Sequence, residues 1–529
     1  MSVMKARQSF REKFWVTALA ILVLLALALF WFSTPHGLAL VNDSVLYIDG
    51  ARNLLQGNGY SRLVGWGGTV PITNFPPFYS FVLALIMALG IAPIQASWWV
   101  SLVFLAVNVV LVSLLGREVT QSVAFGVLAG GLALISDPFF RHHLFALTEP
   151  VFLFYYFLSL LLLIRFLKQR RWYQVLLAGL FAGLSYLTRY IGITLFATGV
   201  IFLLVFQNEW NARLKSAGIF LAGGLPFFLG WTVRNFVVAG NPTNRQFMLR
   251  TLAADKIQEG ITSFWGWLLP EPYQIISRFI DFWGIALIIF LILFTGGFMY
   301  AVWLALKKLE LRGHKDFQAS WLLGLQSLIY LITLAVTILF IDSSVNFETR
   351  VLMPAYVLWL LLFVALLAWL WRFKHWATTV LALVLVVGLS LSFAEDTLDT
   401  IRQWRQQGQG FAHESWTTSQ TIEMTKQLPK VNIFTNRPQA VNLLAQRGAY
   451  ILLSPVNAAT QLPREGYQEE QARIRQMVVE GKAVVVIFGF QDLIQDAENS
   501  WMLELTAGLP VLFEYEKDIV FGNLTLIQD

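Results

Sequence analysis

Five charged residues stand at or near the ends of long apolar runs in this sequence: Asp43, Glu149, Arg189, Arg234 and Arg350. An ionisable side chain is costly at membrane depth, so each of them is a functional candidate. A carboxylate can take up a proton as a general base, and a guanidinium holds phosphate through two parallel hydrogen bonds. Two acids and three arginines therefore predict a site for an anionic headgroup.

Each of these residues also has a structural interpretation. Asp43 precedes an amphipathic run and could be the N-cap of a helix, and Glu149 could complement a helix dipole from the first turn. Arg234 and Arg350 could extend to a membrane interface. Arg189, in the phrase LTRYIG, is the hardest to explain structurally, because it interrupts a long apolar stretch.

A pair of histidines, His142 and His143, precedes Thr148 and Glu149. Two adjacent histidines of a regular helix cannot both point at one metal ion, so we do not expect a zinc site. We expect the pair to lie exposed at the membrane interface.

Composition places these residues in a membrane protein. Of the 529 residues, 57% are hydrophobic and only 13% are charged, about half of the usual charged fraction. The net charge of +6 combines a basic first part with an acidic tail, because residues 395–529 carry 11 basic and 17 acidic side chains. This distribution indicates basic cytoplasmic loops and no nucleic-acid partner. The absence of Cys excludes disulfides, thiolate chemistry and Cys-ligated metals.

Apolar runs of about 20 residues predict roughly eleven transmembrane helices. These runs lie at 14–33, 97–116, 121–136, 146–167, 172–188, 190–206, 216–235, 281–306, 319–341, 351–371 and 376–394. The shorter run at 78–90 suits a helix that does not cross, and leaving it out places every cluster of Lys and Arg on the cytoplasmic side. GxxxG spacings at Gly126 and Gly130, and at Gly179 and Gly183, predict close helix packing.

The predicted fold is therefore a mainly α, polytopic membrane protein with a small C-terminal α/β domain. We expect residues 1–394 to form the membrane domain, with its N-terminus cytoplasmic and with outer loops at 35–95, which carries juxtamembrane helices, and 236–280. Residues 395–529 are expected outside, as a soluble domain with strands near 431–435 and 483–488 and a helix near 467–481.

The order of these elements resembles the GT-C superfamily of membrane glycosyltransferases, particularly the branch of protein O-mannosyltransferases and lipid A aminoarabinose transferases. The residues that carry the resemblance occur in this order: Asp43 with Tyr47, the phrase NFPPFY, Thr148-Glu149-Pro150, Arg189 in LTRYIG, Arg234 and Asn235 in WxxRN followed by GNP, and Arg350 with Pro354. Many relatives carry two adjacent acids in the first loop, whereas Ser44 follows Asp43 here. This departure weakens the case for a bound metal, although a divalent cation stays open.

The resemblance implies transfer of a sugar from a polyprenyl-phosphate carrier to an acceptor hydroxyl on the outer face, with inversion. Asp43 would be the general base, and Glu149 would be a second carboxylate of the site. Arg189, Arg234 and Arg350 would bind the donor phosphate, and Tyr47, His143 and Asn235 are substrate-binding candidates. The acceptor could be lipid, polysaccharide or protein, and membrane lipid would surround the spans.

Two other functions stay open at the level of sequence. A transporter or flippase for a lipid-linked or anionic substrate could use the same charges, but transporters place such groups near the bilayer midplane and often contain internal repeats. An assembly subunit that presents its acidic tail to partners is the third possibility.

Overall fold

A computed structural model describes residues 2–64, 68–207, 209–242, 247–249, 254–269, 278–307, 315–342, 344–457, 460, 462–496 and 499–523. The chain divides into two compact units. The first unit comprises Met1–Pro35, Thr73–Tyr79 and Ser97–Gln406, and the second comprises His36–Ile72, Ser80–Ala96 and Gln407–Asp529. The division between residues 394 and 395 stays a prediction.

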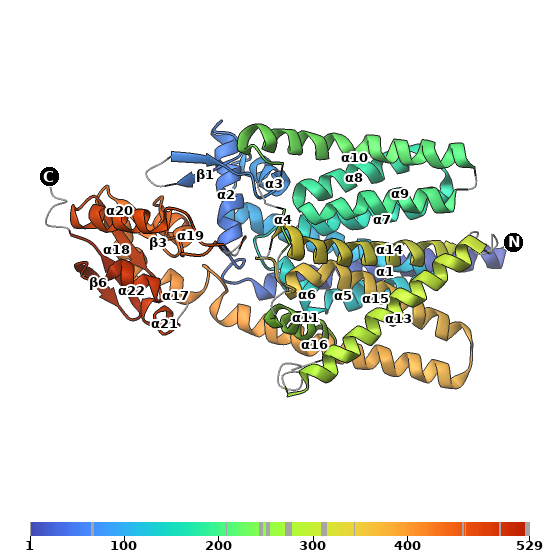
Figure 1. The fold of residues 1–529 in the computed structure, drawn as a ribbon. Helices are drawn as coiled ribbons and strands as arrows, with labels where there is room; N and C mark the ends of the chain where they lie inside the picture. Colours follow the sequence, from blue (N-terminus) through green and yellow to red (C-terminus); the bar gives the residue numbers. More distant parts are fainter. Residues whose placement is uncertain are drawn as a thin grey trace. The chain divides into compact units, whose positions relative to one another are not determined.

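The first unit is built from helices, several of which run alongside one another (Figure 1). They are α1 (Ser2–Ser33), most of α4 (Pro93–Thr120), α5 (Val123–Leu134), α6 (Asp137–His143), α7 (Glu149–Gln169), α8 (Trp172–Thr188), η1 (Tyr190–Ile193), α9 (Thr194–Phe206), α10 (Trp210–Ala239), α11 (Ala254–Leu268), α13 (Ile280–Lys307), α14 (Lys315–Val336), η3 (Thr337–Ile341), α15 (Thr349–Arg372) and α16 (Trp376–Gln407).

Many of these helices can cross a bilayer. Within the described residues, seven are long and apolar enough, and α5 with α6, which meet at a bend of 63°, could form an eighth span. Tyr190–Phe206 and Ile280–Phe294 are shorter apolar helices. The prediction of a polytopic helical membrane protein is confirmed.

The predicted spans coincide with helices, with differences at their ends. α10 begins at Trp210 and ends at Ala239, beyond the predicted range of 216–235 on both sides. The predicted loop at 236–280 contains α11, while its residues 243–246, 250–253 and 270–277 lie outside the described part. The run at 78–90 forms α3 (Phe78–Met87), whose ten residues rise about 15 Å, too little to cross.

The two ends of the helices in the first unit carry different charges. α7 begins at Glu149 and ends at Gln169, about 30 Å away along its axis. At the far end Glu118 forms ion pairs with Lys168 and Arg165, and Arg372 donates a hydrogen bond to the Thr120 carbonyl over 2.7 Å. The basic residues Arg165, Lys168 and Arg372 therefore lie at the end opposite Glu149.

Glycines bring two pairs of helices into close contact. A Cβ on Gly179 of α8 would overlap the carbonyl oxygen of Phe220 in α10, and one on Gly183 would lie 2.8 Å from the Gly224 carbonyl. A Cβ on Gly126 of α5 would lie 2.9 Å from the Ser113 carbonyl in α4. The predicted role of the GxxxG spacings in helix packing is confirmed.

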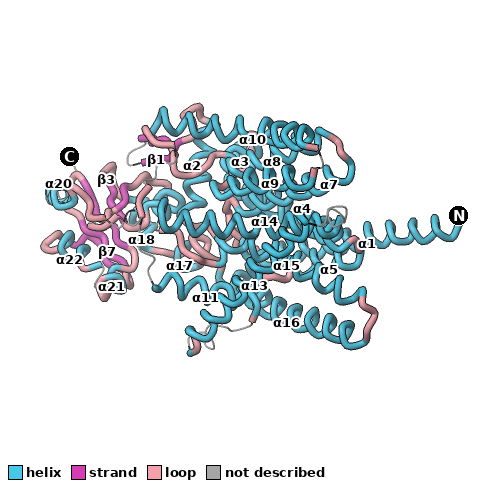
Figure 2. Tube along the Cα trace, turned by 45° about the vertical axis from the view of Figure 1, so that its right-hand side comes forward, coloured by secondary structure: helices cyan, strands magenta, loops and turns pink. Residues whose placement is uncertain are grey.

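The second unit contains a five-stranded sheet between two layers of helices (Figure 2). The strand order is β4-β3-β5-β7-β6, in which β3 is parallel to β4 and β5, and β7 is antiparallel to β5 and β6. The strands are β3 (Asn432–Thr435), β4 (Tyr450–Ile451), β5 (Ala483–Ile487), β6 (Val511–Tyr515) and β7 (Asp518–Phe521).

Alternation along β5 produces the two layers of this α/β fold. Val485 and Ile487 pack toward α20 (Tyr467–Val479), α21 (Phe490–Leu493) and α22 (Trp501–Thr506), whereas Val484 and Val486 pack toward α18 (Gln420–Gln427) and η4 (Val441–Ala445). The short helices α17 (Glu414–Thr417) and α19 (Pro438–Ala440) complete the tail. The predicted small C-terminal α/β region is confirmed.

A segment from early in the chain belongs to the same unit. It comprises α2 (Asn42–Leu55) and the hairpin of β1 (Ser61–Val64) with β2 (Gly68–Pro71). The Phe411 amide donates to the Leu40 carbonyl over 2.7 Å, and Asn442 donates to Asp49 over 2.9 Å. The tail therefore packs against residues around 40 and 49 as one compact body.

Candidate functional site

Glu149 is the centre of a buried ionic cluster in the first unit. Its carboxylate is almost fully buried, and its Oε1 accepts hydrogen bonds from Arg189 Nη1 and Arg350 Nε. The two arginine side chains stay 21% and 22% exposed. The fold thus brings two of the predicted arginines to one predicted acid. Arg189 is 40 residues from Glu149 in the sequence, and Arg350 is 201 residues from it.

Helix ends position these three side chains. Glu149 and Pro150 open α7, where proline is tolerated because its missing N–H would have no partner within the helix. Arg189 follows α8 in extended backbone and donates its amide to the Ser185 carbonyl over 2.9 Å. Arg350 is the second residue of α15. Helix ends hold the cluster in place, so Arg350 pairs with Glu149 rather than extending to an interface.

Thr148 links the cluster further. Its hydroxyl donates to Glu149 Oε2 over 3.3 Å and lies 3.3 Å from Arg189 Nη1, which donates to it. Two guanidinium groups against one carboxylate leave one positive charge. A guanidinium has five N–H donors, more than Arg189 uses in its contacts with Thr148 and Glu149. The cluster therefore suits an anion bound at its exposed side.

Asn235 forms a second polar group, near the end of α10. Its side chain is fully buried, and Nδ2 donates to the carbonyls of Thr73 over 2.9 Å and Pro242 over 3.1 Å. Arg234 Nη1 donates to Asn235 Oδ1 over 2.9 Å. Asn235 thus cross-links backbone segments and contacts Arg234, and its role in substrate binding stays a prediction.

Tyr190, the residue that follows Arg189 in the sequence, also contacts this polar group. Its hydroxyl donates to the Thr73 carbonyl over 3.1 Å and accepts from Trp231 Nε1 over 3.0 Å. Sequence reasoning missed Tyr190 and Thr73. Tyr190 lies within the motif that was singled out for Arg189, whereas nothing in the sequence around Thr73 signals that its carbonyl is the shared acceptor.

The expectation that the histidine pair is exposed was wrong. His142 and His143 are buried in α6. His143 Nδ1 lies 2.7 Å from the Phe139 carbonyl, and Nε2 lies 3.0 Å from Asn108 Nδ2. The amide and the carbonyl engage both ring nitrogens, so His143 holds α6 against α4, and its role in substrate binding stays a prediction.

Asp43 and Tyr47 lie in the second unit, on α2. Asp43 is in the first helical turn and half-buried, and Tyr47 is buried. The N-cap of this helix is Val41, whose amide donates to Ser44 Oγ over 3.0 Å. The interpretation of Asp43 as the N-cap is therefore wrong.

The residues present do not form an evident metal site. Within the described ranges, no three His, Asp or Glu side chains gather closely enough to hold a metal ion. Ser44, which stands where many relatives carry a second acid, uses its hydroxyl at the helix start.

Comparison with known proteins bears on this arrangement. The family model for dolichyl-phosphate-mannose-protein mannosyltransferase matches residues 74–233. Comparison with curated proteins gives no sequence match. Three solved structures are similar over almost the whole chain.

The first is ArnT from Cupriavidus metallidurans bound to undecaprenyl phosphate, with TM-score 0.54, 14% identity, and coverage of 95% of this chain and 97% of that one. The second is the oligosaccharyltransferase AglB from Archaeoglobus fulgidus with an inhibitory peptide and a dolichol-phosphate, with TM-score 0.60, 12% identity, and coverage of 94% and 72%. The chain has the fold of GT-C glycosyltransferases. The arabinofuranosyltransferase AftD from Mycobacteria agrees, with TM-score 0.51, 12% identity, and coverage of 95% and 39%.

The GT-C resemblance seen in the sequence is therefore confirmed at the level of the fold. The family model covers Glu149, Arg189 and the surrounding helices, but ends just before Arg234. The roles of individual residues stay predictions.

Proposed function

We propose that this protein transfers a sugar from a polyprenyl-phosphate donor to an acceptor hydroxyl. The observation that carries the proposal is the Glu149–Arg189–Arg350 cluster, because it leaves one positive charge at helix ends of a GT-C fold. Two structures that share this fold hold undecaprenyl phosphate and a dolichol-phosphate. A lipid-linked phosphate is therefore the anion that suits the cluster best.

The phosphate would be both the part of the donor that the arginines bind and the leaving group of the reaction. Arg189 and Arg350 bind its oxygens, and Arg234 contributes a third guanidinium. Negative charge on the phosphate grows as its bond to the sugar breaks, so a fixed cation stabilises the transition state more than the ground state. Glu149 holds both arginines in place, which makes it a positioning residue in this proposal.

Asp43 would be the general base. The acceptor oxygen attacks the anomeric carbon and forms the new C–O bond as the bond from that carbon to the phosphate oxygen breaks. The electron pair leaves with the phosphate, and the acceptor proton passes to the Asp43 carboxylate. A single displacement of this kind inverts the anomeric configuration.

The proposal also includes an orientation of the chain in the membrane. We place the N-terminus and the basic helix ends in the cytoplasm, because loops rich in Lys and Arg are retained there. Glu149 and its arginines, together with residues 395–529, then face outward. A lipid, a polysaccharide or a protein could be the acceptor on that side.

A transfer assay tests the proposal. Purified protein in liposomes would be given polyprenyl phosphates that carry radiolabelled hexoses or pentoses, with lipid, polysaccharide and protein fractions as acceptors. We expect label to move from one donor into one fraction, and none from soluble nucleotide sugars. Movement of intact donor across the liposome membrane without any transfer would overturn the proposal in favour of a flippase.

A further inference from the structure

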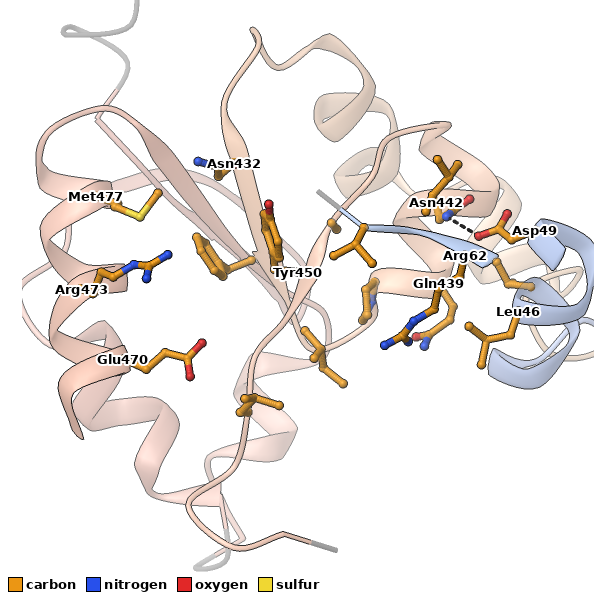
Figure 3. A pocket seen from close by; sticks show the side chains of 18 residues that line it. Leu46, Asp49, Arg62, Asn432, Gln439, Asn442, Tyr450, Glu470, Arg473 and Met477 are labelled. Atoms are coloured by element: carbon orange, nitrogen blue, oxygen red, sulfur yellow. Dashed lines mark hydrogen bonds between the residues drawn. The ribbon is translucent and has the colours of Figure 1, made fainter. Parts of the chain in front are cut away.

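The second unit contains a pocket that none of the proposed catalytic residues lines. Its volume is about 340 Å³, within the range of small-molecule sites. Figure 3 shows Glu470 and Arg473 of α20 along one side, and Leu46, Arg62 and Gln439 along the other. Residues from α2, the first hairpin and the tail all contribute to it, so the pocket exists only because these segments pack together.

Asp49 is the buried polar group of this pocket. Its side chain is 2% exposed, and Oδ2 accepts a hydrogen bond from Asn442 Nδ2 over 2.9 Å. Oδ1 lies 3.7 Å from Arg52 Nη1 and has no hydrogen bond of good geometry within the described residues, although the Leu63 backbone lies close enough to lower the pKa of this carboxyl. A buried oxygen without a hydrogen bond is costly unless a ligand or water supplies the donor. Asp49 thus offers an acceptor whose hydrogen bonding within the described residues is incomplete.

The pocket arginines differ from other arginines of the same unit. Arg475 donates three hydrogen bonds to the carbonyls of residues 504, 505 and 507, and Arg447 donates to those of Leu428 and Pro429. By contrast, the structure records no side-chain hydrogen bond for Arg62 or Arg473 in the described residues, although both line the pocket. These two guanidinium groups remain available to a ligand.

Charge and shape indicate the chemistry of that ligand. Asp49 and Glu470 balance Arg62 and Arg473 in formal charge, so the lining as a whole selects neither an anion nor a cation. The Tyr450 ring stacks on Phe434 with centroids 5.3 Å apart, which fixes an aromatic surface beside carboxylate, carboxamide and guanidinium groups. Planar polar groups can hold neighbouring hydroxyls, and an aromatic surface can contact C–H groups of a sugar ring.

We propose that this pocket binds one or two residues of a neutral glycan. The Asp49 carboxylate accepts hydrogen bonds from the glycan hydroxyls, and the side-chain amides of Asn442 and Gln439 can both donate and accept. Arg62 and Arg473 donate from opposite sides of the pocket. Binding by the pocket stands independently of catalysis. Its use for recognising the acceptor rests on the proposed function.

Direct binding to the full chain in lipid nanodiscs tests this. The probes are the neutral disaccharides maltose, cellobiose and chitobiose, with glucuronic acid and inorganic phosphate as anionic comparisons, and saturation-transfer NMR and calorimetry as readouts. We expect at least one neutral disaccharide to bind. Gln439→Ala and Arg473→Ala should each weaken that binding about tenfold, the effect of losing a hydrogen bond. Gln476→Ala is the matched control, because Gln476 lies on α20, outside the pocket, and donates to Glu480 over 2.8 Å.

The outcomes separate clearly. Failure of every neutral disaccharide to bind at millimolar concentration, or equal binding by wild type and both pocket variants, would overturn the proposal. If glucuronic acid or phosphate binds more strongly than every neutral disaccharide, and Arg473→Ala removes that binding, the proposal of a neutral ligand would be overturned. Because no sugar transfer is measured, disaccharide binding can succeed where the transferase proposal fails, and the reverse also holds. Unchanged thermal unfolding would show that the variants are folded.

Discussion

At the scale of residues, the ionic cluster explains why charges persist at the ends of apolar helices. The sequence predicted that Glu149, Arg189 and Arg350 are functional, but it contained no signal that one carboxylate oxygen serves both arginines. This pairing depends on how α7, α8 and α15 pack. The burial of His143 was missed for the same reason, since hydrophobic periodicity does not report which polar residue finds buried partners.

Loss of Arg189 should weaken phosphate binding specifically. We expect Arg189→Ala to reduce the affinity for sugar-free polyprenyl phosphate about tenfold or more, because a hydrogen bond to a charged group contributes about 1.5–3 kcal/mol. Arg402→Ala is the control, since its pair with Asp399 is largely exposed. Binding would be measured in nanodiscs with a fluorescent polyprenyl phosphate. Equal affinities of the two variants would argue against the phosphate role.

Asp49 should make the stability of the second unit depend on pH. Burial raises the pKa of Asp49 from 3.8 to about 6, against the opposing effects of Arg52 and Asn442. Protonated Asp49 therefore contributes to the free energy of unfolding. This contribution is fully present below about pH 4 and is lost as the pH rises through about 6. Ionised Asp49 should cost up to about 3 kcal/mol at pH 8.

The variant Asp49→Asn isolates this effect. It should raise the thermal unfolding temperature of the second unit at pH 8 and have little effect at pH 4, whereas Asp399→Asn should do neither. Circular dichroism and protease sensitivity of residues 407–529 would follow the unfolding. An equal effect of Asp49→Asn at both values of pH would refute the assignment.

At the scale of elements, sequence and structure agree best where composition alone determines the outcome. Runs of apolar residues placed the helices, and short runs rich in β-forming residues placed β3 and β5. The contact between Asp49 and Asn442 could not be predicted, because 393 residues separate them and no shared periodicity links the two. Likewise, the bend of 63° between α5 and α6 appears in the sequence only as polar residues around Ser136.

The α8–α10 contact should be sensitive to a single methyl group. Gly179→Ala would drive a Cβ into the Phe220 carbonyl, and overpacking typically costs about 1–3 kcal/mol. Gly218→Ala on α10 is the matched control, because nothing lies within 4 Å of its added Cβ. We expect a lower unfolding temperature only for Gly179→Ala.

This substitution should also reduce sugar transfer, because α8 and α10 end beside Arg189 and Arg234. Detergent-solubilised protein monitored by intrinsic Trp fluorescence would give the unfolding temperatures of both variants. Unchanged unfolding of Gly179→Ala would show that the two helices can separate freely.

At the scale of the whole molecule, the orientation of the helices in the membrane determines on which side the proposed sugar transfer takes place. The chain contains no Cys, so each introduced Cys is a unique label. We expect Gln468→Cys, on exposed α20, to react with a membrane-impermeant maleimide in intact cells. Gln169→Cys, at the basic end of α7, should react only after the membrane is disrupted. The reverse pattern would place the ionic cluster in the cytoplasm.

Sugar transfer by wild type and Asp43→Asn, measured side by side with polyprenyl-phosphate donors, tests the proposed chemistry most directly. Asn preserves the shape of the side chain but cannot take the acceptor proton. We expect transfer by the wild type and a rate at least about 100-fold lower for Asp43→Asn, with unfolding temperature and binding of sugar-free polyprenyl phosphate unchanged. A near-normal rate for Asp43→Asn would contradict its role as the base, and absence of transfer by the wild type from every donor would contradict the function itself.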